Sequence, residues 1–319
     1  MALPTLDSTM LVEYIRRAQQ IILMTHVLPD SDAIGSLLGL THALRTLGKS
    51  VTPACSDALR DRFDILPGNT EVVTQATGSF DLALALDCGD ESRLGSVWTN
   101  LPEPRPILVN IDHHISNTHF GEINWIDPAA VSTAELVLQL IDRLCIALNR
   151  DMAICVLYGI VGDTLGFRTP NTTPQTLRYA QRLMEAGASL NDCMDHQFNR
   201  HSRALVCLWG KAIHEMKIDH RIAYTAISKT MRDACGMSTT DLGLSSFLVS
   251  ITEVDRAAVL VENDQGQVEI SLRAKQGHNV SNAAVALGGG GHPLAAGATI
   301  DGPLEIATQR VLQALLQNS

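Results

Sequence analysis

Short apolar runs alternate with stretches of helical periodicity through the first half of the chain. Each run is bounded by polar or turn-forming residues, as buried strands are. The runs are residues 21–25, 51–55, 82–86 and 107–111. Between the first two, apolar residues recur at helical spacing from Ala33 to Leu47, and Gly48 stands where a helix C-cap is expected. This alternation predicts an α/β fold with a doubly wound parallel sheet.

The length of the chain predicts two domains. At 319 residues it exceeds the usual size of a single domain. Helices predicted at 132–148, 151–161 and 174–186 complete a first domain over residues 1–190, and the polar segment 191–214 is expected to be a helical connector. Residues 215–319 have the pattern of a smaller α+β domain. Its expected elements are strands near 222–228, 257–262 and 268–273, a turn at 263–266 and a terminal helix from Leu304.

Composition favours a globular protein without a membrane segment. Hydrophobic residues make up 45% of the chain and charged residues 18%, which is too apolar for a disordered protein. No apolar run approaches the roughly 18 residues that span a bilayer, and the first residues lack the pattern of a secretory signal. Seven scattered cysteines without a CxxC pair suit reduced thiols better than disulfides or a zinc ribbon. A cytoplasmic location is therefore expected.

The charge balance limits the kind of substrate. With a formal net charge of −10, the chain has no basic run that could displace counterions from a long phosphate backbone. Binding to long nucleic acid is therefore not expected. An anionic substrate would need metal ions or a few well-placed arginines.

Acidic and imidazole side chains follow the ends of the predicted strands. Because ligands of open parallel sheets bind beyond the carboxyl ends of the strands, these side chains are expected to meet at one place. They are His26, Asp30 and Asp32 after the first run, Asp87 after the third, and Asp112, His113 and His114 after the fourth. Asp163 adds a carboxylate directly after an apolar segment, where its charge would be costly without a cation nearby.

The crowding of these groups predicts a metal cluster. Several carboxylates brought together would be protonated unless divalent cations neutralised them. Mixed imidazole and carboxylate ligands favour Mn²⁺ over Mg²⁺. Each residue alone has a simpler interpretation, since Asp30 and Asp32 could cap a helix and His113 could be a hydrogen-bonded core histidine. The joint pattern favours the metal, because spacing and strand context agree.

Six ordered motifs carry a resemblance that spans nearly the whole chain. Four lie in the first part: HVLPDSDAIGS, LALALDCGD, DHHISNTHFG and GIVGDTLGFRTPNTT. Two lie in the second part: ISLRAK and GGGGHPLAAG. With these motifs the sequence resembles the DHH phosphoesterases, and within them the bacterial oligoribonuclease/pAp-phosphatase (NrnA-like) type with its DHH-associated substrate domain. The resemblance implies a DHH catalytic domain followed by a substrate-binding domain.

Carried over by position, the resemblance implies two divalent metal ions, with Mn²⁺ preferred. One ion would be bound by His26, Asp30 and Asp87, and the other by Asp32, Asp87, His113 and Asp163. Asp87 would be the ligand that both ions share. His114 would contact the substrate phosphate and protonate the leaving oxygen, while Asp112 would orient the neighbouring histidines.

The resemblance also implies substrate-binding residues. Arg273 and His292 match positions that grip the phosphate or terminal base of a nucleotide, with arginine offering a bidentate fork. The remaining candidates are Gly289, Gly290, Gly291, Arg168 and Asn117. The glycines could present backbone amides to a phosphate, although a loop alone would explain them. A surface salt bridge is the alternative for Arg168.

Some neighbouring residues leave alternatives open. Asp90 is expected to stay outside the metal shell, because the end of the strand is the better-supported position. Ser132 and Thr133 could begin a helix whose N-terminus binds an anion, or could only cap it. Leu165 stands where family members often have glycine, and Pro293 where a basic residue is frequent. These departures concern substrate preference and not the chemistry.

The implied activity is hydrolysis of di- to pentanucleotide RNA to mononucleotides, together with 3′-phosphate removal from pAp, by a metal-activated water in a cleft between the domains. Linear and cyclic dinucleotides, pApA and cyclic di-AMP, are alternative substrates. The glycine-rich second domain disfavours an inorganic pyrophosphatase, and the complete ligand set disfavours a non-catalytic nucleotide sensor. Absence of a basic track disfavours a processive exonuclease of the RecJ type. The sequence is compatible with a homodimer.

Overall fold

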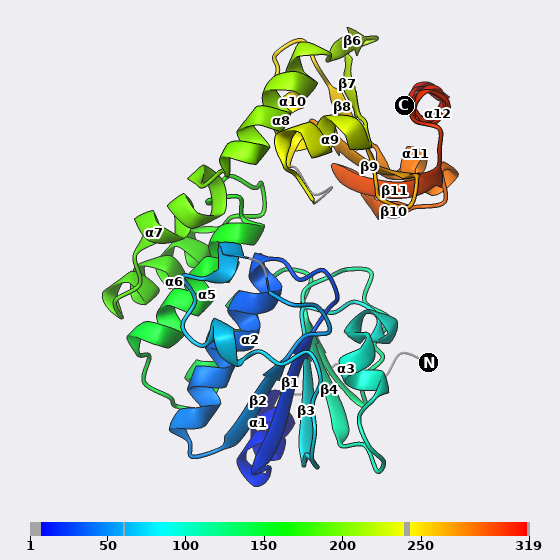
Figure 1. Ribbon diagram of the computed structural model, residues 1–319. Helices are drawn as coiled ribbons and strands as arrows, with labels where there is room; N and C mark the ends of the chain where they lie inside the picture. Colours follow the sequence, from blue (N-terminus) through cyan, green and yellow to red (C-terminus); the bar gives the residue numbers. More distant parts are fainter. Residues whose placement is uncertain (1–7, 60, 239–242, 318–319) are drawn as a thin grey trace. The chain divides into compact units, whose positions relative to one another are not determined.

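The computed structural model describes residues 8–59, 61–238 and 243–317, which form two compact units that divide between Arg200 and His201. Figure 1 shows the units in the colours of the sequence, with the first running from blue to green. The division falls inside the segment 191–214, for which the sequence predicts a helical connector. Helical elements cover most of that segment: α7 (Leu190–Met194), a π-helical turn (Asp195–Asn199) and α8 (Arg203–His214).

A five-stranded parallel sheet lies at the centre of the first unit, with strand order β2-β1-β3-β4-β5. Its strands are β1 (Gln20–Thr25), β2 (Ser50–Ala54), β3 (Leu82–Leu86), β4 (Ile107–Asp112) and β5 (Ile123–Ile126). The strand order reverses between β1 and β3, so the switch point of the sheet lies at the carboxyl ends of these two strands. The predicted doubly wound α/β architecture is confirmed, with β5 as an additional strand.

The strands of this sheet are buried on both faces. Along β1, Ile21 and Leu23 belong to one hydrophobic cluster, while Ile22 and Met24 belong to another on the opposite face. Because side chains alternate across a strand, a sheet covered on both faces requires a continuous apolar run. This double coverage explains why short, uniformly apolar runs predict the strands correctly.

Helices cover the two faces. The first unit contains α1 (Ser8–Arg17), α2 (Ser31–Thr46), α3 (Ser96–Thr99), α4 (Thr133–Arg143), α5 (Arg150–Asp163) and α6 (Pro174–Glu185). The larger cluster draws on α1, α2, α4 and α5, and the smaller one on Val97 and Trp98 of α3. The helices predicted at 151–161 and 174–186 correspond to α5 and α6, while the helix predicted at 132–148 is shorter, because α4 ends at Arg143. None of the described helices combines the length and apolar character needed to cross a membrane.

Glycines let α2 and α5 approach each other closely. A Cβ atom on Gly162 would lie 2.5 Å from the Ser31 Cβ, and one on Gly159 would lie 2.7 Å from the Ala134 Cβ and 3.0 Å from Asp32 Oδ1. The two shorter distances are below those that real Cβ atoms show. The crossing therefore depends on glycine, and it holds the first turn of α2, with Asp32, against the last turns of α5.

A six-stranded mixed sheet forms the second unit, with strand order β10-β11-β9-β8-β7-β6. Its strands are β6 (Lys217–Asp219), β7 (Ile222–Ile227), β8 (Arg256–Glu262), β9 (Gln267–Ala274), β10 (Gly290–His292) and β11 (Ala295–Asp301). Only β7 and β8 pair in parallel. One face carries α8, α9 (Lys229–Cys235) and α10 (Leu244–Leu248), and the other carries α11 (Ser281–Ala286) and α12 (Leu304–Gln317). The predicted α+β character is confirmed, while the glycine- and alanine-rich β10 and β11 lacked a sequence signal.

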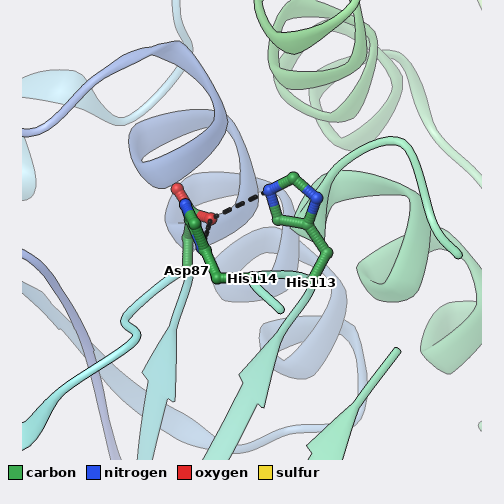
Figure 2. A group of neighbouring side chains, drawn as sticks. All are labelled: Asp87, His113 and His114. Carbon is green, nitrogen blue, oxygen red and sulfur yellow. Dashed lines mark ion pairs between the residues drawn. The ribbon is translucent and has the colours of Figure 1, made fainter. Parts of the chain in front are cut away.

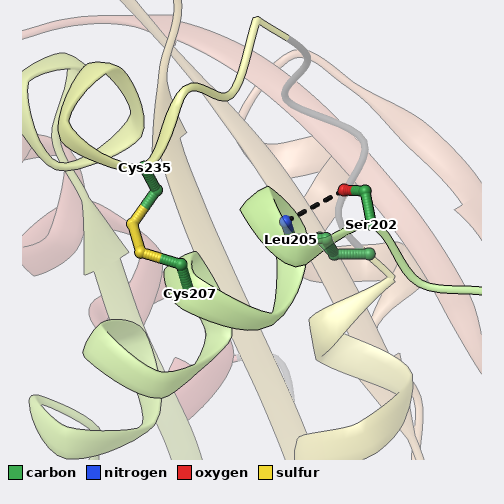
Figure 3. The surroundings of a disulfide bond; sticks show 4 residues. All are labelled: Ser202, Leu205, Cys207 and Cys235. Carbon is green, nitrogen blue, oxygen red and sulfur yellow. Dashed lines mark hydrogen bonds between the residues drawn. A yellow bond between two sulfur atoms is a disulfide. The ribbon is translucent and has the colours of Figure 1, made fainter.

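A disulfide bond links Cys207 in α8 to Cys235 at the end of α9 (Figure 3). For this pair the expectation of reduced thiols is wrong. The two residues are 28 positions apart, and only the packing of α8 against α9 brings their Cα atoms to 5.8 Å. Spacing along the sequence cannot report such an approach. The other five cysteines all lie in the described residues and are free.

Candidate metal centre

The side chains expected to bind metal converge at the carboxyl ends of β1, β3 and β4 and at the adjoining ends of α2 and α5. They form overlapping groups in which the candidate ligand atoms lie within 4.8 Å of one another. The groups are His26, Asp30 and Asp87; Asp32, His113 and Asp163; and Asp87, His113 and His114. We refer to these seven residues as the metal-ligand cluster. It lies at the switch point of the sheet, where an open α/β fold binds its ligands.

Asp87 lies at the centre of the metal-ligand cluster. Its Oδ2 is 3.6 Å from His26 Nε2. Its Oδ1 is 3.7 Å from His113 Nε2 and 3.6 Å from His114 Nδ1 (Figure 2). The side chain is buried, and the backbone is left-handed with a φ of 57°, a conformation that is uncommon outside glycine and concentrated at functional sites. One oxygen faces each ligand group, as a bridging ligand requires.

Asp30 uses its two carboxylate oxygens differently. Its Oδ1 caps α2 by accepting hydrogen bonds from Asp32 N and Ala33 N, both at 3.0 Å. Its Oδ2 lies 3.9 Å from His26 Nε2. Capping therefore leaves one oxygen directed toward the cluster, so the structural and the metal-binding interpretations of Asp30 are compatible.

The carboxylate of Asp32 is fully buried at the start of α4. Its Oδ2 accepts a hydrogen bond from Thr133 N at 2.6 Å, and its Oδ1 accepts one from Ala134 N at 2.8 Å. Amide groups at a helix N-terminus attract an anion. The sequence left open whether this helix start binds an anion or is only capped. In the structure Ser132 caps the helix through Glu135 N, and the next two amides donate to the side chain of Asp32.

The surroundings of His113 Nε2 show whether these residues fit a cation. Its Nε2 is buried and makes no hydrogen bond of acceptable geometry, although Asp163 Oδ2 lies 3.1 Å away and oxygens of Asp32 and Asp87 lie at 3.9 and 3.7 Å. A buried nitrogen without a hydrogen bond is costly, and so are unbalanced carboxylates around it. A divalent cation among these atoms would remove both costs, so the residues present fit a metal ion.

The pKa values of the cluster show the same excess of negative charge. Burial raises the pKa of Asp32 well above its usual value, and the nearby charges of Asp87 and Asp163 add to the effect. Burial also raises the pKa of Asp163 to about 6. At His113, burial opposes the charged ring, but the surrounding carboxylates outweigh it and raise the pKa to about 10. Protons are thus retained where a metal ion would balance the charge.

Asp112 orients His114. Its Oδ1 accepts a hydrogen bond from His114 Nδ1 at 2.7 Å and one from the backbone N–H of His113 at 2.8 Å. Because the partner of Nδ1 is a buried carboxylate, we assign a proton to that nitrogen. The hydrogen bond that His114 donates to Asp112 is also the main cause of the raised pKa of His114. A raised pKa favours the protonated ring that a general acid needs.

Asn117, which the resemblance places among the substrate-binding residues, is buried and turned toward the protein. Its amide nitrogen donates to Asp112 Oδ2 at 2.5 Å and to the Cys88 carbonyl at 3.1 Å. Its Oδ1 accepts the backbone N–H of His119 at 2.7 Å. Through these contacts Asn117 holds Asp112 in place, and its side chain does not face the solvent.

Asp90 and Arg168 have local partners. Asp90 caps the short 3₁₀ helix Glu91–Leu94 through Ser92 and belongs to none of the ligand groups found among the described residues. Arg168 Nε donates to the Leu165 carbonyl at 2.6 Å, and its guanidinium lies 5.7 Å from the centre of the Phe198 ring. Arg168 is therefore held by a backbone bond and an aromatic ring, and it forms no salt bridge with any residue that the structure describes.

Arg273 and His292 lie in one row across the sheet of the second unit. Ala295 of β11 pairs with Arg273 of β9 on one side and with His292 of β10 on the other. Directly paired residues point to the same face of a sheet. Neighbouring strands are about 4.8 Å apart, so the backbones of the two residues are about 10 Å apart. The register thus places both expected substrate-binding side chains on one face, separated only by a small alanine.

Close strand packing accounts for two of the three glycines expected to contact phosphate. A Cβ atom on Gly289 would lie 2.1 Å from the Gly297 carbonyl oxygen, and one on Gly291 would lie 2.5 Å from the Ala296 Cα. A Cβ on Gly290 would meet nothing within 4 Å. Gly289 and Gly291 are therefore needed for the pairing of β10 with β11, whatever their contact with a ligand.

The structure shows two side-chain contacts with the cluster that the sequence did not predict. Thr133 Oγ1 donates to Asp87 Oδ1 at 3.1 Å, and Arg93 Nη2 lies 3.1 Å from His26 Nδ1. Thr133 carries a sequence signal only as the start of a helix. Arg93 follows Asp87 by six residues in the turn after β3, and no feature of that spacing indicates the contact.

Comparison with known proteins supports the resemblance. Residues 20–160 match the model of the DHH family, N-terminal domain, and residues 228–318 match that of the DHHA1 domain. The chain is 35% identical over 300 residues to the bifunctional oligoribonuclease and PAP phosphatase NrnA of Thermus thermophilus, covering 92% of this chain and 89% of that protein. It is 29% identical over 297 residues to the Bacillus subtilis protein of the same name, covering 92% and 93%.

Among solved structures, an exopolyphosphatase-related protein from Bacteroides fragilis matches with a TM-score of 0.90 and 26% identity. The match covers 97% of this chain and 95% of that one. The resemblance first seen in six motifs is confirmed by these matches and is consistent with the cluster of carboxylates and histidines around Asp87. The chain belongs to the DHH family of phosphoesterases.

Proposed function

We propose that this chain hydrolyses short oligoribonucleotides to mononucleotides and removes the 3′-phosphate from pAp. The observation that carries the proposal is the central position of Asp87, whose two oxygens face two groups of candidate ligand atoms. The names of the two NrnA relatives contain both activities, which supports the choice of substrates. The net charge of −10 favours short substrates over long nucleic acid.

Two divalent cations are part of the proposal, with Mn²⁺ preferred because the ligands mix imidazole and carboxylate groups. One would be held by His26, Asp30 and Asp87, and the other by Asp32, Asp87, His113 and Asp163. Such a pair, when bound, supplies an activated water and stabilises the attacking and leaving oxygens of an in-line displacement. The excess negative charge around His113 supports this assignment.

The protein's own groups would orient the reaction and move protons. Asp112 holds the His114 ring through Nδ1, and Asn117 holds Asp112 in turn. Because the pKa of His114 is raised, its ring is protonated over a wider pH range than an ordinary histidine. His114 would donate that proton to the leaving oxygen, so that an alcohol departs in place of an alkoxide.

The second unit is proposed to bind the substrate. Arg273 and His292 share one face of its sheet, from which they would contact the phosphate or terminal base of a short nucleotide. At Gly290 an added Cβ would meet nothing within 4 Å, so this glycine leaves room for a ligand beside the strand. Arg168 would be a further contact to the substrate. The enzyme would act in the cytoplasm.

The test is turnover by the Mn²⁺-loaded protein, measured side by side on pAp, RNA dinucleotides and pentanucleotides, cyclic di-AMP and pyrophosphate. We expect release of phosphate from pAp and of mononucleotides from the short RNAs. An Asp87→Asn variant purified in the same way should be inactive, which controls for contaminating phosphatases. Turnover of pyrophosphate alone would overturn the proposal. A preference for cyclic di-AMP would mean that the enzyme hydrolyses phosphate esters as proposed but acts on a cyclic dinucleotide.

A further inference from the structure

Arg93 lies beside the His26 side of the metal-ligand cluster. It belongs to the short 3₁₀ helix Glu91–Leu94, and its Nη2 is 3.1 Å from His26 Nδ1. Its carbonyl accepts a hydrogen bond from Val27 N at 2.7 Å, which fixes this helix to the loop that follows β1. The side chain is exposed, and within the described part of the chain it forms no ion pair. A cation is therefore held at the rim of the cluster, and its charge acts on Asp90 without forming a direct ion pair among the described residues.

Binding of a metal ion by His26 would release Arg93 from this contact. His26 Nε2 faces Asp30 and Asp87, so Nε2 is the nitrogen placed to bind the ion. A metal-bound imidazole keeps a proton on its other nitrogen and donates it to a nearby acceptor. For Nδ1 that acceptor is the Val27 carbonyl, 2.8 Å away. Since a protonated nitrogen cannot accept, the guanidinium of Arg93 must then find another acceptor.

The charges of the cluster indicate what that acceptor is. Two divalent cations would balance its four carboxylates and leave no excess positive charge for an anionic substrate. Arg62 also lies beside the loop after β1, but its Nη2 donates to the Pro29 carbonyl at 3.0 Å and its guanidinium lies over the Phe63 ring. Among the described residues, Arg93 is a cation that metal binding by His26 would make available. A guanidinium binds phosphate oxygens with a planar fork.

We propose that Arg93 binds an oxygen of the substrate phosphate beside His26 and thereby selects for phosphate esters at this end of the cluster. The inference rests on the proposed function for the identity of the substrate. The alternative role for Arg93 is to orient His26, which would make it a support for metal binding. The two roles differ in the equilibrium that a substitution changes, namely phosphate binding in one case and Mn²⁺ binding in the other.

Arg93→Gln and Arg93→Lys test the proposal, with Arg178→Gln as a control that removes an exposed arginine from α6. Mn²⁺ affinity is measured by calorimetry on metal-stripped protein, and AMP affinity by equilibrium dialysis on Mn²⁺-loaded protein. We expect Arg93→Gln to weaken AMP binding about 10- to 100-fold, the loss of one hydrogen bond to a charged group, and to leave Mn²⁺ binding unchanged. Arg93→Lys should be intermediate because it keeps the charge and loses the fork.

Weaker Mn²⁺ binding with unchanged AMP affinity in Arg93→Gln would overturn the proposal and assign Arg93 to the orientation of His26. Equal AMP affinity in Arg93→Gln and Arg178→Gln would overturn it as well. AMP binding is measured without turnover, so this result is independent of whether pAp and short RNA are the substrates. Thermal unfolding of each variant verifies that it is folded.

Discussion

The backbone N–H of Thr133 donates a hydrogen bond to Asp32 Oδ2 at 2.6 Å, so the first turn of α4 supports a carboxylate on the first turn of α2. The two residues are 101 positions apart in the sequence. A second bond runs from the Thr133 hydroxyl to Asp87 Oδ1 at 3.1 Å. Thr133 therefore contacts two candidate ligands, one through its backbone and one through its side chain, and only the second contact can be removed by substitution.

Thr133→Val should weaken metal binding with little effect on folding. The substitution removes the bond to Asp87 and keeps the shape of the side chain, and loss of a group that orients a ligand typically costs about 10- to 100-fold in metal affinity or activity. Ser132→Ala is the matched control, because it removes the cap of α4 and should cost about 1 kcal/mol of stability without that loss of affinity. Mn²⁺ titration and thermal unfolding measure the two effects. Equal Mn²⁺ affinity in both variants would exclude a role for the hydroxyl.

Asp112→Asn should lower the pKa of His114. The hydrogen bond that His114 donates to Asp112 is the main cause of the raised pKa of His114, and the substitution removes the carboxylate charge. A general acid is active only while protonated, so a lower pKa should move the alkaline limb of the pH–rate profile to lower pH. NMR titration of the His114 ring and the pH dependence of kcat are the measurements. An unmoved alkaline limb, with a shifted ring titration, would show that His114 is not the acid.

Metal binding should become weaker as the pH falls. The pKa of His113 is raised to about 10, so near neutral pH a metal ion must displace its proton, and affinity should change by about tenfold per pH unit. The pKa of Asp163 is raised to about 6, and below that value its proton must be displaced as well. The dependence should therefore steepen below pH 6. Calorimetry in buffers of different ionisation enthalpy measures the released protons, and a pH-independent affinity would contradict the assignment of both ligands.

Gly159→Ala should destabilise the first unit. A Cβ at this position would lie 2.7 Å from the Ala134 Cβ and 3.0 Å from Asp32 Oδ1, and overpacking of this kind costs about 1–3 kcal/mol. Gly210→Ala in α8 is the control, because a Cβ there meets nothing within 4 Å. It should stabilise the chain by about 0.5–1 kcal/mol through better helix propensity. Chemical denaturation gives both values, and a neutral Gly159→Ala would show that α5 can move away from Ala134 of α4 and Asp32 of α2 without loss of stability.

Reduction of the Cys207–Cys235 bond should destabilise the second unit. The bond closes a loop of 28 residues, for which the chain-entropy estimate is about 3.5 kcal/mol. Denaturation with and without a reductant measures the loss of stability. The Cys207→Ser variant should show the same loss when no reductant is present. Cys145→Ser, which alters an exposed free thiol of the first unit, should have no such effect. An unchanged midpoint on reduction would mean that the bond contributes nothing to stability.

Local patterns in the sequence predicted the fold class of the first unit and four of the five strands of its sheet, and they missed β5. The run at residues 82–86 coincides with β3, and the runs at 21–25 and 107–111 differ from β1 and β4 by one residue. Burial on both faces of a sheet leaves such runs uniformly apolar, and this is a property of consecutive residues. The positions of His26 and Asp87 directly after strands also follow from the sequence, because parallel strands end at a common edge.

Only the tertiary structure decided which of these groups touch one another and through which atoms. The bond of Thr133 to Asp32, the approach of Arg93 to His26 and the disulfide between α8 and α9 each join segments that are remote in the sequence. For Asn117 the sequence indicated a substrate contact. In the structure its buried amide donates a hydrogen bond to Asp112. The sequence by itself determined the elements and the kinds of chemistry, because these depend on residue type and local order. Distances between remote segments depend on how the helices pack, and no local pattern records them.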